Sequence, residues 1–598
     1  NKADNPDALD TSTSWTNGPV TDGGIAEWNA AVTTANASPI GNGVNLAGVR
    51  ITDPGGDVTI QQGTAGTLAL GPAGIDATTS LRVLTLSTPV RLDAPQTWAT
   101  GNSGSAGSLQ ITANGTISGP GGIDLTAISD RGLALNSANT FSGGVTMRSG
   151  GIQYSGAPSI AASGASVTSG PFGTGPLAIH GGVLTAGSRP FFNPAVSIQG
   201  DFTWSTAARV DTSGGFDLTG GTRTIRLTRS VSPANVVVSG GNNSIRFTTI
   251  TGGSSSNTFS NGTLALAASP QISAPNLVVA TFGASGGNRY IDNSGLVIGP
   301  RVYVSPSFTS SPFGAAANEK PAVTLEAGGF LSLSDGGSGR GHAIFSLAGQ
   351  GTVLNNTSGT AARTDTLTID GGAKTATFEF AGVIRDTDTA TFPTADPNLK
   401  TALVKAGCTT QVLSGTCSHT GSTAVTGGVL RVTGNLSGTS GLAISTGARF
   451  ENTGSVSIAG DITNDGTMVL SGNAALSFSG AFTNNGVLDL SSWNGTLAPG
   501  VSNHGTIIPA PGPEVFSRWQ SIHWPGTGEA QTIGPEADPD HDGANNLLEW
   551  ALHLDPKSPD VFLPVFSKAG QALEYRYVRR KTAPGSAAFQ LEWADSFD

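Results

Sequence analysis

Apolar and polar residues alternate along most of the chain, in short runs separated by residues that favour turns. Clear examples lie at residues 58–60, 68–70, 83–86, 90–92 and 109–111. A period of two puts one side of an extended chain into a core and the other into solvent. Gly, Asn, Ser and Thr fill the gaps, as expected for turns. The pattern therefore predicts many short β-strands and an all-β fold.

Two segments far apart in the sequence align without gaps. Residues 135–154 match residues 413–432, with Gly143 opposite Gly421 and Gly150 opposite Gly428, and residues 257–266 are a weaker relative. Each copy has the pattern of a strand, a glycine-containing turn and a second strand. Internal repetition of this kind indicates a stack of similar units.

The repeat shortens to 20 residues towards the C-terminus. Residues 461–471 are followed by the similar segment 481–491. The signature Asn-x-Gly recurs at Asn452, Asn464, Asn484 and Asn503. Asn and Gly tolerate positive φ, so they suit corners, and stacked asparagines can form an amide ladder. A coil of about 20 residues predicts a long right-handed parallel β-helix, a β-solenoid, over residues 51–508.

The two ends of the chain differ from this regular part. We predict an N-terminal cap with the first strands at residues 1–50; Trp15, Trp28 and Trp98 either close the end of the core or are ordinary core aromatics. Residues 509–513 form a proline-rich linker. Residues 514–598 then predict a small, mainly β C-terminal domain. Its elements are a helix or loop at 516–524, a helix at 545–554, and a hairpin made of 573–578 and 588–593.

Residues 538–549 carry the most specific chemical pattern of the chain. They fit D-x-[DN]-x-[DN]-G-x5-E, with Gly543 at the sharp turn. The predicted ligands are the side chains of Asp538, Asp540, Asp542, Asn546 and Glu549, and the carbonyl of Ala544. Calcium binds six to eight such oxygens, so the loop predicts a calcium site that adds rigidity. The alternative is a solvated acidic turn.

Composition excludes several other classes. Only 12% of residues are charged, the net charge is −11 and the pI is about 5.1, which argues against nucleic acid as a partner. No apolar run reaches 18 residues, so no membrane span is expected. We interpret Asn1 as a mature or trimmed end. Cys408 and Cys417 predict a disulfide worth roughly 2–3 kcal/mol in an oxidising compartment, with two thiols as the alternative.

The sequence gives little support for catalysis. The seven histidines are scattered and lack a nearby nucleophile or carboxylate pattern. The densest cluster of charges comprises Asp365, Asp370, Glu379, Arg385, Asp386 and Asp388. We interpret this cluster as a solvated loop rather than as the paired carboxylates of a glycosidase groove. The protein is therefore not expected to be an enzyme.

The two long repeat copies resemble the autotransporter-associated β-strand repeat. Residues 14–18 and 24–28 look like the start of secreted passengers of this family in Verrucomicrobia and Planctomycetes, and residues 497–500 resemble the motif that often closes them. Residues 538–556 resemble an acidic element near the C-terminus of such proteins. Cys417, His419 and Asn545 depart from these patterns. The resemblance implies a secreted β-helix with surface, adhesive or matrix roles and without enzyme activity.

Three functions compete at this point. The first is an extracellular structural protein, a subunit of a surface fibre or homopolymeric filament, joined by stacking of solenoid ends or by donation of a strand from residues 1–11. The second is a monomeric cell-surface adhesin that binds glycans. The third, and weakest, is a β-helix enzyme that degrades polysaccharide. All three place the protein outside the cell.

Overall fold

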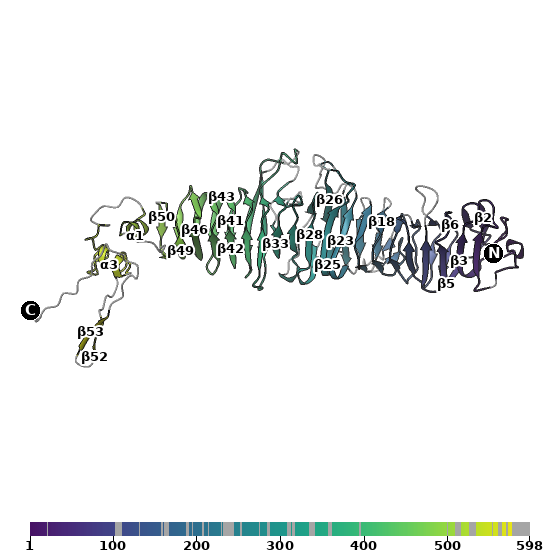
Figure 1. The fold of residues 1–598 in the computed structure, drawn as a ribbon, viewed down its shortest axis with the longest axis horizontal. Helices are drawn as coiled ribbons and strands as arrows, with labels where there is room; N and C mark the ends of the chain where they lie inside the picture. Colours follow the sequence, from purple (N-terminus) through teal and green to yellow (C-terminus); the bar gives the residue numbers. More distant parts are fainter. Residues whose placement is uncertain are drawn as a thin grey trace, which may run out of the picture. The chain divides into compact units, whose positions relative to one another are not determined.

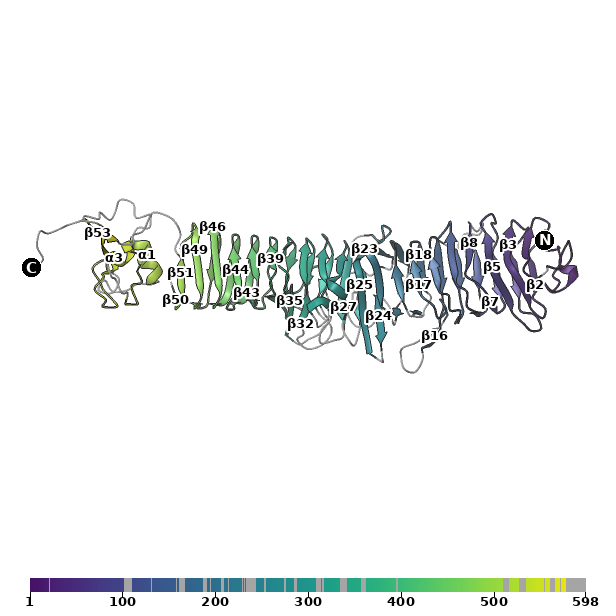
Figure 2. The ribbon, with the colours of Figure 1, turned by 90° about the horizontal axis from the view of Figure 1, so that it is seen from below.

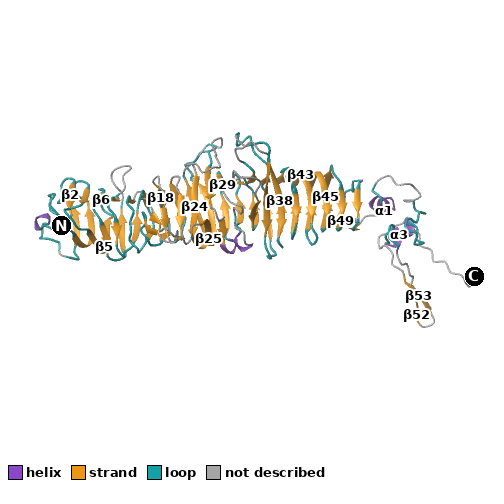
Figure 3. Cartoon of the chain, turned by 180° about the vertical axis from the view of Figure 1, so that it is seen from behind, coloured by secondary structure: helices purple, strands orange, loops and turns teal. Residues whose placement is uncertain are grey.

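The structure is a computed structural model in which strands predominate and helices are few (Figure 3). It describes residues 1–20, 22–101, 110–130, 132–156, 159–160, 167–186, 191–193, 195–205, 209–212, 215–228, 230, 232, 244–251, 254–273, 276–283, 288–307, 313, 317–333, 341–356, 362–393, 396–498, 500–508, 516–525, 534–552, 554–559, 565–569 and 572–576. Two compact units divide the chain. Unit 1 comprises Asn1–Ala373 and Phe378–Ala402, and unit 2 comprises Lys374–Thr377 and Leu403–Asp598.

Within the described ranges, unit 1 consists of short strands and a few short 3-10 helices. The first part contains η1 (Ser12–Ser14), β1 (Ile25–Asn29), β2 (Asn36–Pro39), β3 (Val44–Thr52), β4 (Val58–Gln61), β5 (Leu68–Ala77), β6 (Leu84–Ser87), β7 (Val90–Leu92), β8 (Gln96–Thr100), β9 (Ile111–Ala113), β10 (Ile117–Ser118), β11 (Ile123–Ala127), β12 (Leu133–Leu135), β13 (Val145–Met147), β14 (Gly151–Tyr154), β15 (Ser159–Ile160), β16 (Val167–Ser169), β17 (Leu177–Ile179) and β18 (Val183–Ala186). The second part contains β19 (Phe191–Asn193), β20 (Val196–Ile198), β21 (Phe202–Ser205), β22 (Arg209–Thr212), β23 (Phe216–Leu227), β24 (Ser244–Thr251), β25 (Ser254–Ala268), β26 (Val278–Gly283), β27 (Asn288–Tyr290), η3 (Ile291–Asn293), β28 (Gly295–Ile298), β29 (Val302–Ser307), η4 (Ala317–Glu319), β30 (Ala322–Leu325), β31 (Phe330–Ser332), β32 (Gly341–Ile344), β33 (Ser346–Gly349), β34 (Thr352–Leu354), β35 (Arg363–Asp370) and β37 (Val383–Ile384).

Unit 2 continues with strands and ends with helices and a hairpin. Two strands, β36 (Thr377–Phe380) and β38 (Leu399–Ala406), contain the unit boundaries. The remaining strands are β39 (Thr410–Leu413), β40 (Thr416–Cys417), β41 (Thr423–Val425), β42 (Val429–Val432), β43 (Asn435–Ile444), β44 (Arg449–Asn452), β45 (Ser455–Asn464), β46 (Thr467–Gly472), β47 (Ala475–Phe478), β48 (Phe482–Asn484), β49 (Val487–Trp493), β50 (Val501–Asn503) and β51 (Thr506–Ile508). They are followed by α1 (Phe516–His523), α3 (Asn546–Leu552), β52 (Val565–Ala569) and β53 (Ala572–Arg576).

The strands of each unit pair in parallel with strands of the preceding and following coil (Figures 1 and 2). In unit 1, Val58 of β4 is in register with Leu84 of β6, which is in register with Ile111 of β9. All three side chains are fully buried, while the intervening threonines face outward. The fold is therefore an all-β parallel β-solenoid, as the alternation of apolar residues predicted. The right-handed sense of the coil stays a prediction.

The predicted amide ladder is present in unit 2. Asn464 Nδ2 donates to Asn484 Oδ1 at 2.6 Å, and Asn484 Nδ2 donates to Asn503 Oδ1 at 2.6 Å. Asn464 and Asn484 are fully buried. The fourth predicted member, Asn452, lies on β44 instead and donates to the Ala475 carbonyl at 2.9 Å. The ladder therefore has three asparagines, one for each of three successive coils.

The N-terminal segment is folded onto the first coil. The backbone N–H of Lys2 donates to the Glu27 carbonyl of β1 at 2.7 Å, and that of Leu9 donates to the Pro39 carbonyl of β2 at 2.8 Å. Trp15 packs on Trp28 with ring centroids 6.1 Å apart. The N-terminal segment therefore covers the start of the first coil, and the bounds of the predicted cap at residues 1–50 stay a prediction. In the structure, residues 1–11 are hydrogen-bonded to the chain's own first coil, and donation of this segment to a neighbouring chain stays a prediction.

Unit 1 has a second hydrophobic cluster. It consists of Leu277, Val279, Tyr303, Leu354 and Phe392, with the partly buried Phe330 beside it. Val302, Tyr303 and Val304 are consecutive in β29 and all are buried, although alternate residues of a strand point to opposite faces. Both faces of β29 are therefore covered, and Phe392 of a later loop contributes to the cover.

The C-terminal part of unit 2 differs from its predicted form. A helix occupies Phe516–His523, and a second occupies Asn546–Leu552 within the predicted 545–554. Strand β53 forms an antiparallel hairpin with the preceding β52, Val565 opposite Arg576. The predicted partner at 588–593 and the linker at 509–513 lie outside the described residues.

Candidate metal centre

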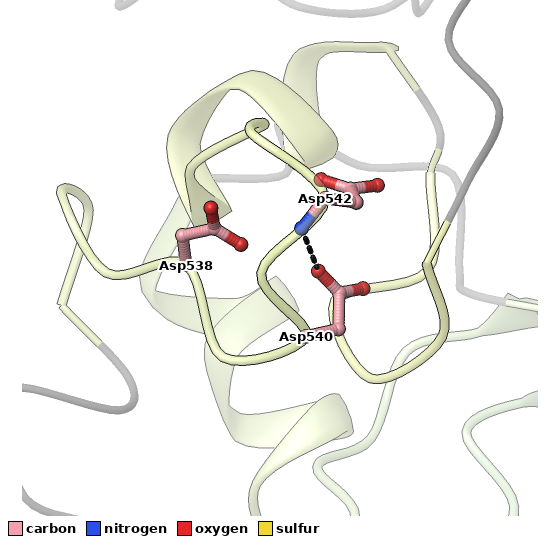
Figure 4. Close-up of side chains that lie close together, drawn as sticks. All are labelled: Asp538, Asp540 and Asp542. Atoms are coloured by element: carbon pink, nitrogen blue, oxygen red, sulfur yellow. Dashed lines mark hydrogen bonds between the residues drawn. The ribbon is translucent and has the colours of Figure 1, made fainter.

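Three aspartates converge in the loop that leads into α3 (Figure 4). One carboxylate oxygen from each of Asp538, Asp540 and Asp542 lies within 4.8 Å of the others. Their side chains are partly buried. Among the described residues this is the only group of three or more His, Cys, Asp or Glu side chains that close together.

Backbone hydrogen bonds hold the loop in its curl. The Gly543 N–H donates to Asp538 Oδ2 at 3.0 Å, and the Ala544 N–H donates to Asp542 Oδ1 at 2.8 Å. The Asp542 N–H donates to Asp540 Oδ1 at 3.3 Å. Gly543 has φ 94°, a left-handed conformation that glycine adopts without strain. The glycine at the sixth position of the motif is thus explained by the turn it makes.

The other three predicted ligands start the helix beneath the loop. Ala544 and Asn546 are buried, and Asn546 Nδ2 donates to the Gly534 carbonyl at 2.9 Å. Glu549 has no exposed surface, which is unusual for a carboxylate. It does not belong to the group of oxygens within 4.8 Å of one another. The structure therefore brings together the three aspartates and places Glu549 one helical turn further on.

Negative charge accumulates in this loop. Burial raises the pKa of Asp540, and the neighbouring carboxylates of Asp542 and Asp538 raise it further, although a hydrogen bond from the Asp542 backbone opposes the shift. Among the described residues, no hydrogen-bond donor reaches Oδ1 of Asp538 or Oδ2 of Asp540. Carboxylate oxygens are hard ligands, and their negative charges repel one another unless a cation lies between them. Such a group of ligands fits a divalent cation such as calcium. The residues present therefore fit the predicted ion.

An aromatic cluster anchors α3 to α1. Trp519 and Trp550 are each 1% exposed, and Phe516, Trp524 and Leu547 pack against them. Trp550 directly follows Glu549 on α3, so the position of the acidic loop depends on this packing. The sequence analysis missed the cluster, although three tryptophans within 32 residues were a visible signal.

A cavity of about 370 Å³ lies in unit 2 beside this cluster. Its walls come from residues 503–507 of the last coil, from α1, and from residues 554–557. Burial lowers the pKa of His523, which lines the cavity, to about 4; Asp555 opposes and Lys557 reinforces that shift. His523 is therefore neutral at physiological pH. The cavity shows that α1 and the segment after α3 lie beside the final coil.

The charged cluster between Asp365 and Asp388 is structural. Asp365 is fully buried and pairs with Arg363, Nε to Oδ2, at 3.0 Å. Asp370 pairs with the buried Lys320, and Asp388 pairs with Arg385. Asp386 Oδ1 accepts the Thr401 N–H at 2.7 Å, whereas Glu379 is exposed on β36. The interpretation as a solvated loop is wrong, because Asp365, Asp370 and Asp388 each pair with a basic residue of the fold.

The predicted disulfide is not formed. Cys417 ends β40 with its side chain buried in the core, whereas Cys408 is exposed in the turn before β39. A disulfide requires Cα atoms about 4.4–6.8 Å apart and side chains that point towards each other. Strand β39 lies between the two cysteines in the sequence, and one side chain is exposed while the other is buried, so a spacing of nine residues was an insufficient guide.

Comparison of the chain with protein-family models, with curated proteins and with solved structures gives no match. The resemblance to autotransporter-associated repeats stays a prediction. Within the described ranges, no helix has both the length and the apolar character needed to cross a bilayer.

Proposed function

We propose that the protein is an extracellular structural protein: a β-solenoid scaffold that forms part of a surface fibre. The single observation that supports this role most strongly is that charged and amide side chains of the protein bond to one another within the fold. Ion pairs occupy the mid-chain carboxylates, and stacked amides and apolar side chains fill the coils. A protein whose charged and amide side chains stabilise its own fold is suited to bear load rather than to transform a substrate.

The second part of the proposal is that calcium binds at Asp538, Asp540 and Asp542. A divalent cation neutralises three adjacent carboxylates that otherwise repel one another, and so it stabilises the loop and α3. The Asn546 amide and the Glu549 carboxylate, buried in the first turns of α3, are the remaining candidates for completing the site. This role is structural and requires no catalytic step.

Fibre formation is tested on the intact purified protein by negative-stain electron microscopy. Rods of uniform width support the role of a fibre subunit. Isolated particles at all concentrations count against it and favour the adhesin.

Calcium binding is tested separately by calorimetric titration of the calcium-free protein with CaCl₂. Asp540→Asn removes one charged ligand and is expected to weaken binding by at least tenfold. The matched control is Asp555→Asn, an exposed acidic residue outside the loop. Absence of heat with the unaltered protein contradicts the calcium proposal without affecting the fibre.

A further inference from the structure

Residues 1–16 form a plug over the first coil of unit 1, beside β2 and β3 in Figures 1 and 2. The plug is tied together by its own contacts. Lys2 forms an antiparallel bridge with Trp15, and the Trp15 indole donates to the Leu9 carbonyl at 2.9 Å. The Lys2 Nζ donates to the Asn5 carbonyl at 2.6 Å and to Asn5 Oδ1 at 2.8 Å. The segment therefore has a fixed structure of its own.

The plug covers the open side of the first coil. Its hydrogen bonds reach both strands that open the solenoid, through Glu27 of β1 and Pro39 of β2. Two carboxylates tie it further: Asp4 Oδ2 accepts from the Thr33 hydroxyl at 2.6 Å, and Asp10 Oδ2 accepts the Asn42 N–H at 2.9 Å. Without it, β1 and β2 would expose unpaired backbone groups, which are a template for pairing with another chain.

The plug also covers apolar surface. Leu9 is 1% exposed and Trp15 is 4% exposed, and both lie at the end of the core that contains Trp28. Trp28 itself has no exposed surface. Removing the plug would expose a large aromatic side chain beside an open strand edge. Together these are the two components of a stable protein interface, an apolar centre and main-chain donors.

The two opening strands are not equivalent. Position 39 of β2 is a proline, which lacks the N–H needed to extend a ladder and is typical of protected edges. Strand β1 has no proline at residues 25, 27 and 29. Its Glu27 carbonyl points to the open side, where it accepts a hydrogen bond from the backbone N–H of Lys2. In a parallel ladder the N–H and the carbonyl of one residue point the same way. Strand β1 is therefore the edge that can accept a partner.

We propose that the plug masks a latent self-association surface, and that its removal allows β1 to pair with β1 of a second copy. The partner is a second copy because the exposed surface would be self-complementary: an open edge beside Trp28 meets an identical edge across a two-fold axis. The other end of a second copy is less suitable, because residues 503–507 already lie beside α1 and the segment after α3. Association therefore stops at a dimer. This inference depends on the coil stack alone and not on calcium or on a role in fibres.

The test is the mass in solution of a plug-free protein, measured by size exclusion with light scattering. Residues 16–19 are exposed, so a protease site placed there allows the plug to be cut away after folding. The expected result is a twofold increase in mass with an unchanged circular dichroism spectrum. A second variant that lacks residues 1–16 from the outset is expected to give the same dimer.

Glu27→Pro is the matched control, because it removes the N–H on the open side of β1 while the ladder with β3 uses the other side. Plug-free Glu27→Pro is expected to remain a monomer, and the uncut Glu27→Pro protein should match the unaltered one in mass, although it lacks the hydrogen bond from the Thr52 hydroxyl to Glu27 Oε1. The inference is overturned by a plug-free protein that stays folded and monomeric, that forms longer polymers, or that dimerises equally well with Glu27→Pro.

Discussion

The coils at residues 403–508 of unit 2 and the segment of unit 1 at residues 277–373 and 378–402 solve the same packing problem differently. In the former, alternate residues point inward and a buried polar group recurs at a fixed place, as in the asparagine ladder. In the latter, strand β29 is buried on both faces, and the charged side chains of Lys320 and Asp365 are buried as well. One region is periodic, and the other is held by contacts that occur once.

The two regions also differ in how exposed their ion pairs are. Glu451 in the periodic coils is shared by Arg431 and Arg449, whose side chains are 42% and 41% exposed. Asp365 is 1% exposed and its partner Arg363 is 15% exposed. Exposed pairs contribute little because water screens them, whereas a buried pair becomes costly when one partner is removed. The irregular segment should therefore be far more sensitive to single charge substitutions.

The largest expected effect follows from Asp365→Ala. This change leaves the guanidinium of Arg363 largely buried beside an apolar side chain and is expected to cost about 3–5 kcal/mol. Hydrogen exchange of peptides from β32 and β35 measures the loss as faster local opening. Asp93→Ala, which breaks an exposed pair with Arg91, is the control and should cost less than about 1 kcal/mol. Equal effects would remove the distinction between buried and exposed ion pairs on which the comparison rests.

Alkaline pH should separate the two regions next. Burial raises the pKa of Tyr303 to about 12, against hydrogen bonds with Ser332 and Asn356 that lower it. Because the folded pKa lies above the unfolded value of about 10, this stabilisation is complete below pH 10 and is lost as pH rises towards 12. The loss amounts to about 3 kcal/mol at most.

Hydrogen exchange of peptides from β29 and β31, corrected for the intrinsic effect of pH, measures this loss. Tyr303→Phe should abolish the component between pH 10 and 12. The coils at 403–508 contain no tyrosine and serve as the internal control. A pH dependence that survives Tyr303→Phe would assign the loss to another group.

In the periodic coils, Asn484→Ala should have a moderate effect. It removes both ladder bonds of that residue and leaves the buried Asn464 amide with one acceptor fewer, at a cost of about 2–3 kcal/mol. Protection from exchange should fall in β45 and β50 as well as in β48. The control is Asn494→Ala, because its bond to Asn473 is exposed. An effect confined to β48 would mean that the coils do not cooperate through the ladder.

The smallest effect is expected from Glu451→Gln. Burial tends to raise the pKa of Glu451, but hydrogen bonds and charge from Arg449 and Arg431 outweigh it, so the pKa is lowered. The stabilisation is therefore present above the unfolded pKa and is lost as pH falls through the folded value. We expect less than about 1 kcal/mol, measured as a shift in acid unfolding. A loss as large as that of Asp365→Ala would contradict the role assigned to exposure.

The periodic part of the fold could be predicted because its information is local. Asn464 and Asn484 are 20 residues apart and occupy equivalent corners, so the sequence repeat predicts which residues of successive coils lie side by side. The aspartates of the acidic loop were predictable for the same reason, since their spacing of two residues places them on one turn. The position of Glu549 depends on how α3 packs through Trp550, and the motif does not encode that packing.

The irregular segment could not be predicted from pattern alone. Phe392 lies 89 residues from Tyr303, with which it makes a ring contact of 5.4 Å, and no period relates them. The residues around Phe392 are mostly polar and look like a solvated loop. Likewise, apolar residues occur in the segments both before and after β53, and the sequence alone could not decide that β53 pairs with β52. Contacts between distant segments decide these cases.

Hydrogen bonds connect one coil to the next, and they include the side-chain hydrogen bonds that link Asn464, Asn484 and Asn503. Tension applied along such a stack pulls each bond in the direction in which it breaks, so coils should peel away one at a time. Each 20-residue coil then releases about 70 Å of chain. A fibre built from these coils would lengthen in steps and absorb work before it ruptured.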